Sequence, residues 1–129
     1  MAQRETRLAS PLRSALERAR VRVTKLHGNK FQAGLPDWLL EGPRRYGLAE
    51  VKVWPRSSSP TALEGLAFCT GLQRRWLMRA WVKGHPAWLV LVSESKGVVV
   101  IRGDRMGVED ETRWLSLEEA VAVIKEGLR

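Results

Sequence analysis

The sequence contains few of the residues that usually hold metals or form cross-links. Its 129 residues include one cysteine, Cys69, and two histidines. A single cysteine excludes an internal disulfide, and the absence of a Cys/His cluster excludes a zinc site of the usual composition. We assign Cys69 to packing rather than chemistry. An unpaired thiol is typical of a reducing compartment, so we expect a cytoplasmic protein.

Long apolar runs are also missing. No stretch approaches the length that crosses a bilayer, and the first residues lack the apolar segment of a signal peptide. We therefore expect no membrane partner. The length fits a single domain. Residues 1–9 are basic and are expected to form an N-terminal tail or the start of a helix, followed by one domain over residues 10–129.

Acidic residues are outnumbered by basic ones, and the net charge is +8. Residues 1–93 hold 16 Lys and Arg against 6 Asp and Glu (net +10), whereas residues 94–129 hold 6 against 8 (net −2). A phosphate backbone attracts such a concentration of positive charge. The charge distribution therefore favours a nucleic-acid partner for the first part of the chain.

The stretch from Leu35 to Trp54 is predicted to form a β-hairpin. Two apolar runs, residues 38–40 and 48–54, flank a segment that contains two glycines and a proline. Side chains alternate between the faces of a strand, so Ala49, Val51 and Val53 are expected to face the core. The opposite face then carries Leu48, Glu50, Lys52 and Trp54.

Two carboxylates and a lysine come together in this hairpin if its strands pair. Asp37, at the start of the first strand, would lie beside Glu50 and Lys52 on the second. Paired carboxylates form a hard oxygen site of the kind that Mg²⁺ prefers, and a neighbouring lysine can orient an attacking water. The structural alternative is that Asp37 caps a turn while Glu50 and Lys52 form an ion pair on an exposed strand.

The pattern Pro36-Asp37, followed thirteen residues after the Asp by Glu50-Val51-Lys52, resembles the PD-(D/E)xK nuclease signature. The resemblance covers about residues 10–102. It implies that Asp37, Glu50 and the backbone carbonyl of Val51 bind the metal and that Lys52 is catalytic. The implied cofactor is Mg²⁺, with Mn²⁺ able to substitute. Stand-alone basic domains of this size resemble archaeal and phage Holliday-junction resolvases and VRR-NUC proteins.

Two further site residues depend on the same resemblance. Gln73 opens a helix over residues 70–83 that resembles the helix after the motif in VRR-NUC-type nucleases, where the matching Gln lies near the metal. Gln73 also completes a capping box with Thr70, and the two roles are compatible. Many of these nucleases carry another acidic ligand on the first helix. Glu17 is the candidate, with Glu5 the poorer alternative, although Glu17 falls opposite the apolar stripe and can pair with Arg13 or Arg20.

Several basic residues near the motif are candidate DNA contacts. Trp54, which leaves the second strand of the hairpin, is the one tryptophan that we consider for base stacking. The polar loop at residues 27–34 and the Pro/Ser-rich segment at residues 55–60 flank the motif. The candidate phosphate contacts are Lys25, His27, Lys30, Arg56, Arg74 and Arg75.

The expected fold is α/β: a single domain with a central mixed β-sheet flanked by helices, the restriction-endonuclease-like core that the resemblance implies. Besides the hairpin and the helix at residues 70–83, we expect a helix from Ser10-Pro11 to about Arg20 and a strand at 21–26. A short helix at 61–68, buried strands at 87–93 and 98–102, and a helix at 117–127 complete the prediction.

The function expected from these residues is Mg²⁺-dependent endonucleolytic hydrolysis of DNA, selective for branched structures as in resolvases. A homodimer is implied by analogy, because two strands must be cut symmetrically. The alternatives are a VRR-NUC-type flap or general DNA nuclease, a basic nucleic-acid-binding module without catalysis, and an RNA-processing nuclease. If the protein is phage-encoded, its compartment is the host cytoplasm.

Overall fold

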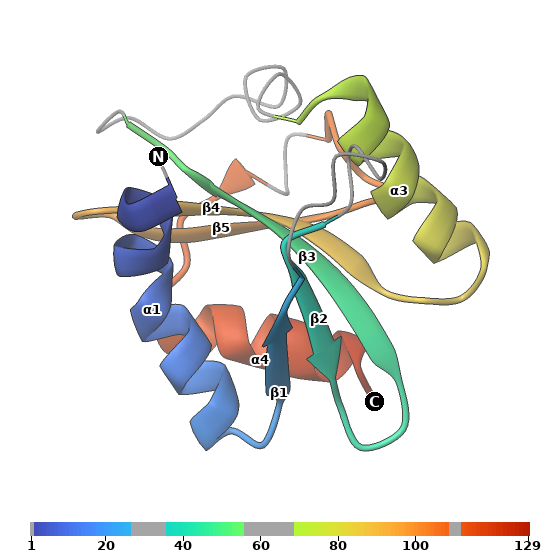
Figure 1. Cartoon of the computed structure of the whole chain (residues 1–129), viewed down its shortest axis with the longest axis horizontal. Helices are drawn as coiled ribbons and strands as arrows, with labels where there is room; N and C mark the ends of the chain where they lie inside the picture. Colours follow the sequence, from blue (N-terminus) through green and yellow to red (C-terminus); the bar gives the residue numbers. More distant parts are fainter. Residues whose placement is uncertain (1, 27–35, 56–68, 109–111) are drawn as a thin grey trace.

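A computed structural model describes residues 2–26, 36–55, 69–108 and 112–129, and for residues 2–6 it describes the backbone alone. The expected helix at 61–68 lies outside these residues. The described part forms one mixed sheet flanked by helices, so the predicted fold class is confirmed (Figure 1). The helices are α1 (Ala2–Arg18), α3 (Gly71–Val82) and α4 (Leu117–Gly127), and the strands are β1 (Arg22–Lys25), β2 (Trp38–Glu41), β3 (Tyr46–Val53), β4 (Ala87–Ser93) and β5 (Gly97–Arg102).

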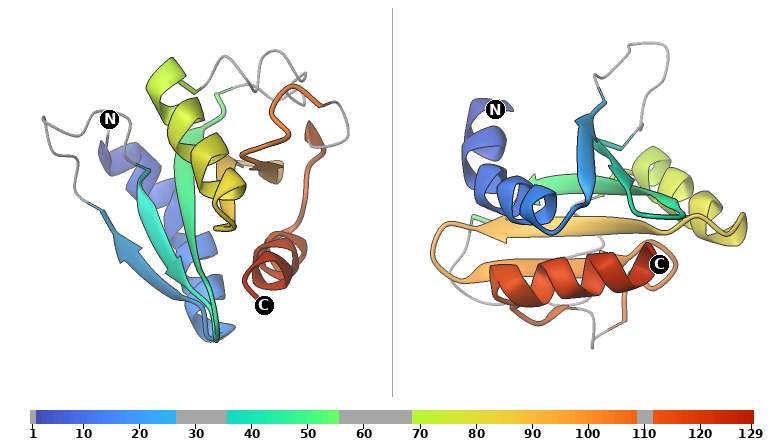
Figure 2. Two further views of the ribbon diagram at one scale, coloured as in Figure 1. Left: turned by 90° about the vertical axis from the view of Figure 1, so that its right-hand side faces the viewer. Right: turned by 90° about the horizontal axis from the view of Figure 1, so that it is seen from below.

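The five strands follow one another across the sheet in chain order. All neighbours are antiparallel except β3 and β4, which are parallel and are joined by a crossover that contains α3. The sheet is strongly twisted, and Figure 2 shows β1 and β2 crossing β4 and β5 at a steep angle. The central strand β3 therefore has a partner on each edge, which holds its backbone in register.

Each face of the sheet packs against a separate hydrophobic cluster. The first contains Leu12 and Leu16 of α1, Ile124 of α4 and the side chains of Ala49 and Val51, so α1 and α4 cover that face. The second contains Leu77 and Ala80 of α3 with the alternate side chains of β4 and β5. In Figure 1, α3 accordingly lies on the opposite side of β3 from α1 and α4. The two faces of the hairpin strand are the ones that its alternation predicts.

Helix α1 starts at Ala2 and contains Pro11, so Ser10-Pro11 does not begin it. Of the two expectations for residues 1–9, a tail or the start of a helix, the structure has the helix over residues 2–9. A proline inside a helix removes one backbone hydrogen bond and costs about 3 kcal/mol. Burial of Ala9, Leu12 and Leu16 in the first cluster offsets this cost, because each fully buried large aliphatic side chain contributes about 1.5–3 kcal/mol.

The two later helices begin at the residues that their capping patterns predict. Thr70 forms a reciprocal capping box with Gln73, and Ser116 forms one with Glu119. The turn between β4 and β5 requires a glycine, because Gly97 has φ of 116° and a Cβ there would collide with the carbonyl of Leu115. None of the described helices is long and apolar enough to span a membrane.

Candidate active site

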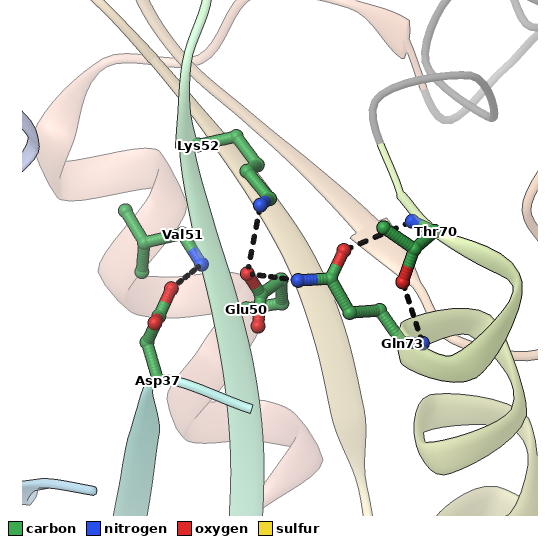
Figure 3. Close-up of polar contacts among 6 residues, drawn as sticks. All are labelled: Asp37, Glu50, Val51, Lys52, Thr70 and Gln73. Atoms are coloured by element: carbon green, nitrogen blue, oxygen red, sulfur yellow. Dashed lines mark hydrogen bonds and ion pairs between the residues drawn. The ribbon is translucent and has the colours of Figure 1, made fainter. Parts of the chain in front are cut away.

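The pairing of β2 with β3 brings the motif residues together. Trp38 of β2 pairs with Ala49 of β3 at the end of the ladder. The residues that come next in this register, Asp37 and Glu50, therefore lie opposite each other. The Asp37 carboxylate Oδ2 accepts a hydrogen bond of 2.9 Å from the backbone N–H of Val51. This bond fixes the carboxylate against the strand that carries Glu50 and Lys52, as Figure 3 shows.

Pro36 ends the backbone ladder at this point. Continuing the register by two residues from Trp38 and Ala49 places Pro36 opposite Val51. A proline has no N–H, so it cannot donate to the Val51 carbonyl, and the Asp37 side chain takes the Val51 N–H instead. The N–H and C=O of one strand residue point to the same side, so the Val51 carbonyl faces the Asp37 side of β3.

The two oxygens of Glu50 have different surroundings. Oε2 lies 3.2 Å from the Lys52 ammonium Nζ and accepts a 3.0 Å hydrogen bond from the Gln73 amide Nε2. Oε1 is buried and has no hydrogen-bond partner among the described residues. Figure 3 shows Lys52 and Gln73 converging on one side of the carboxylate. An unpartnered buried oxygen is costly, which is a reason to expect a ligand there.

Burial raises the pKa of Glu50 to about 8. The side chain is 3% exposed, and loss of water disfavours the ionised form. The nearby Asp37 carboxylate raises the pKa further, whereas the Lys52 ammonium opposes the increase. The short Lys52 contact alone would suggest an ionised pair, but burial and the second carboxylate outweigh it. In the metal-free protein at neutral pH, Glu50 is therefore mostly protonated.

Gln73 is positioned by its own helix terminus. Its backbone N–H donates to the Thr70 hydroxyl at 3.1 Å, and its side-chain Oε1 accepts from the Thr70 N–H at 2.9 Å. The same amide group donates its Nε2 to Glu50. The two roles expected for Gln73, helix cap and neighbour of the site, thus occur together, because the amide has an acceptor and a donor on opposite sides.

The donor set fits a hard divalent cation. It consists of the Asp37 carboxylate, the free Oε1 of Glu50 and the carbonyl of Val51, all oxygen ligands. Mg²⁺ is commonly held by one or two carboxylates while it keeps several waters. Among the described residues, no third His, Cys, Asp or Glu side chain joins these two carboxylates to form a larger metal-binding group.

The structure does not bring Glu17 to this site. Its carboxylate is exposed and lies 3.7 Å from the Arg13 guanidinium, one turn away on α1. That helix covers the sheet face opposite Glu50, so the prediction that Glu17 is a ligand is not supported. Glu5 belongs to α1, but its side chain lies outside the described residues. Trp54 is 2% exposed within the cluster beneath α3, so the prediction that it stacks on bases is wrong.

The candidate DNA contacts are only partly described. Lys25 is exposed at the end of β1, and Arg74 and Arg75 are exposed in the first turns of α3, next to Gln73. These positions leave all three free to meet a phosphate backbone, and their roles stay predictions. His27, Lys30 and Arg56 lie outside the described residues.

The mixed five-stranded sheet flanked by three helices is a restriction-endonuclease-like fold. Among solved structures, the chain is similar to Hjc, a Holliday junction resolvase from the archaeal hyperthermophile Archaeoglobus fulgidus. The TM-score is 0.56 at 17% sequence identity, and the match covers 92% of this chain and 96% of Hjc. No protein-family model matches the sequence, and no curated protein matches it.

Proposed function

We propose that this protein is a metal-dependent endonuclease that hydrolyses phosphodiester bonds in branched DNA. The observation that carries the proposal is the convergence of Asp37, Lys52 and Gln73 on Glu50, whose Oε1 is buried and has no hydrogen-bond partner among the described residues. A protein that only binds DNA has no use for two adjacent carboxylates near phosphates, because they repel the backbone.

Asp37, Glu50 and the carbonyl of Val51 would hold Mg²⁺, or Mn²⁺ in its place. When bound, the ion lowers the pKa of a coordinated water and neutralises charge on the phosphate. Gln73 and the Lys52 ammonium both contact Oε2, which leaves Oε1 without a hydrogen-bond partner among the described residues and so available to the ion. Lys52 then orients the attacking water and stabilises the negative charge that develops on the phosphate.

Selectivity for branched DNA is supported by the fold and the charge. The fold is that of Hjc, which is described as a Holliday junction resolvase. The net charge of +8 suits a phosphate-rich partner. Resolution of a four-way junction requires two cuts related by symmetry, so we propose a homodimer with one site in each copy. A flap or general DNA nuclease is the alternative substrate class.

The direct test is cleavage of end-labelled four-way junction, flap and linear duplex DNA in Mg²⁺. The variants are Asp37→Asn and Lys52→Ala, with Glu17→Gln as the matched control because Glu17 is an exposed acid on the other face of the sheet. We expect paired symmetric cuts in the junction. Asp37→Asn and Lys52→Ala should each reduce cleavage at least about 100-fold, the scale of losing a group that stabilises transition-state charge.

The outcomes separate the candidate functions. Cleavage of flap or duplex that needs Asp37 would keep the nuclease and discard selectivity for junctions. Binding that is sensitive to salt, without cleavage in Mg²⁺ or Mn²⁺, would refute the enzyme and favour a non-catalytic binding module. RNA substrates matched in structure test an RNA-processing role. Loss of cleavage in Glu17→Gln would show that the site extends to α1.

A further inference from the structure

A cavity beside the candidate active site has no role in the proposed chemistry. Its volume is about 410 Å³, and it lies between the β2–β3 hairpin and the second half of α3. The hairpin contributes Leu39, Tyr46 and Leu48, and the helix side contributes Trp76, Lys83 and other residues. This volume falls within the range of sites that bind small organic groups, roughly 300–1,000 Å³.

The lining of the cavity combines flat apolar surfaces with positive charge. Tyr46 is 57% exposed, although large aromatic side chains are usually buried, and Trp76, which also lines the cavity, is half-buried. Arg79 and Lys83 are exposed at the rim, where His85 also lies. No acidic side chain is among the described residues that line the cavity. Aromatic faces suit a nucleobase, and the cationic rim suits its phosphate.

The cavity and the candidate active site share one face of the sheet. Leu39 lies two residues from Asp37 on β2, and Leu48 lies two residues from Glu50 on β3, so these side chains point the same way. Helix α3 contributes Gln73 to the site and Trp76, one turn later, to the cavity. At about 3.4 Å per residue, Tyr46 is roughly 14 Å along β3 from Glu50. The span from site to cavity is that of a few nucleotides.

The walls of the cavity are joined by a side-chain hydrogen bond. Arg45, in the hairpin turn, donates from Nη2 to the carbonyl of Gly84 at 2.7 Å, in the turn that follows α3. Gly84 adopts φ of 85°, a conformation that suits glycine. The hairpin tip and the end of α3 are thus held at a set distance. A preformed cavity avoids the entropic cost of ordering its walls when a ligand binds.

We propose that this cavity binds an unpaired nucleobase of the DNA strand that enters the active site, with Tyr46 and Trp76 stacking on the base and Arg79 and Lys83 contacting its phosphate. The inference rests on the proposed function and deepens it. Bases in a duplex are already stacked and cannot enter such a cavity, whereas a single-stranded arm of a flap or fork offers unstacked ones, and a four-way junction does so where base pairs at its centre open. The protein would therefore recognise a branch by its exposed base and not by the duplex arms alone.

The test measures binding in EDTA, where cleavage cannot interfere. The probes are an oligothymidylate of about eight nucleotides, within the usual site size, and the same backbone without bases. We expect the wild type to bind the thymidine strand about tenfold more tightly than the abasic strand. Tyr46→Leu and Trp76→Leu keep an apolar side chain but lose the ring, and each should remove most of this difference, while Tyr46→Phe should retain it.

A second pair of variants tests the phosphate contact. Lys83→Gln should weaken binding of both strands several-fold and reduce its dependence on salt. Lys125→Gln is the matched control, because Lys125 is exposed on α4 at the other face of the sheet, and it should bind both strands as the wild type does. Equal weakening by the two substitutions would show a general charge effect and overturn this contact.

The same proteins separate this inference from the proposed function. Forked DNA with normal or abasic arms is incubated with Mg²⁺, and the cleavage rates are compared. Cleavage that is indifferent to the bases and to Tyr46→Leu, together with equal affinity for both single strands, would overturn the base-binding cavity and keep the nuclease. Base-dependent binding that needs Tyr46, without cleavage of any substrate, would keep the cavity and refute the nuclease.

Discussion

Replacing Glu50 by Gln should make the metal-free protein less sensitive to pH. The pKa of Glu50 is raised from 4.5 to about 8, so between these values the folded protein holds a proton that the unfolded chain has released. Stability contributed by this proton is present below pH 4.5 and is lost as the pH rises toward 8. The substitution removes the titrating group while conserving its volume.

The magnitude follows from the size of the shift. Each pKa unit corresponds to about 1.36 kcal/mol, so a change from 4.5 to about 8 predicts a loss of up to about 5 kcal/mol of unfolding free energy. The steepest part of the curve should approach 1.4 kcal/mol per pH unit. Glu50→Gln should lack this slope, and at pH 8.5 it should be more stable than the wild type. Under the proposed function the same substitution should abolish cleavage.

The assay is urea denaturation in EDTA at pH 5.5, 7 and 8.5, followed by tryptophan fluorescence. Trp54 and Trp88 are buried and report the loss of both hydrophobic clusters. Burial raises the pKa of Cys69 from 9.0 to about 11, so its thiol adds to the pH dependence only near pH 8.5, and it does so in the wild type and in Glu50→Gln alike. Glu17→Gln is the control. Equal pH slopes in the wild type and Glu50→Gln, or a wild type that becomes more stable as the pH rises, would refute the reasoning.

Three further predictions concern the metal and the backbone. Mg²⁺ at about 100 times its dissociation constant should stabilise the wild type by about 2.7 kcal/mol in thermal unfolding at pH 8, and Asp37→Asn should lose this effect; equal stabilisation of both would place the ion elsewhere. Thr70→Ala should lower the free energy of unfolding in urea by about 1 kcal/mol, and it should slow cleavage because it removes the helix cap that orients Gln73. An unchanged cleavage rate would contradict this role of the cap. Gly97→Ala should lower the free energy of unfolding by at least about 1–3 kcal/mol, because φ is positive and the Leu115 carbonyl occupies the space of the new Cβ. Gly107→Ala, with φ of 90° but open space around it, should lower it less, and equal losses would contradict a steric effect of Leu115.

The arrangement of the hairpin could be predicted from the sequence because it depends on local rules. Strand alternation places Glu50 and Lys52 on one face, and a turn between two apolar runs brings Asp37 beside them. The structure has this arrangement. The contact of Gln73 with Glu50 could be predicted only from the resemblance to the nuclease signature. The periodicity of α3 does not indicate which strand the helix covers or on which face of the sheet it lies.

Other features depend on tertiary packing that local patterns do not contain. Pro11 is typical of a helix start, but burial of Ala9 and Leu12 against the sheet extends α1 past it. Trp54 follows a charged strand, yet α3 covers that face and buries it. The same packing of α3 on this face of β3 buries Glu50 and so raises its pKa. The sequence identifies Pro36 only as part of a motif, and its effect on the hydrogen-bond ladder follows from the register of β2 and β3 in the structure.

The parallel pairing of β3 with β4 has a consequence for how the protein folds. The hairpin can form early because its strands are adjacent in the chain, but β3 meets β4 only after the crossover through α3 has closed. Contacts between distant residues form slowly, because chain entropy is lost before they are made. A folding intermediate with the hairpin alone would carry Asp37 and Glu50 in water, without Gln73. Cleavage should therefore recover on refolding together with the protection of β4 amides from hydrogen exchange, and not with the hairpin.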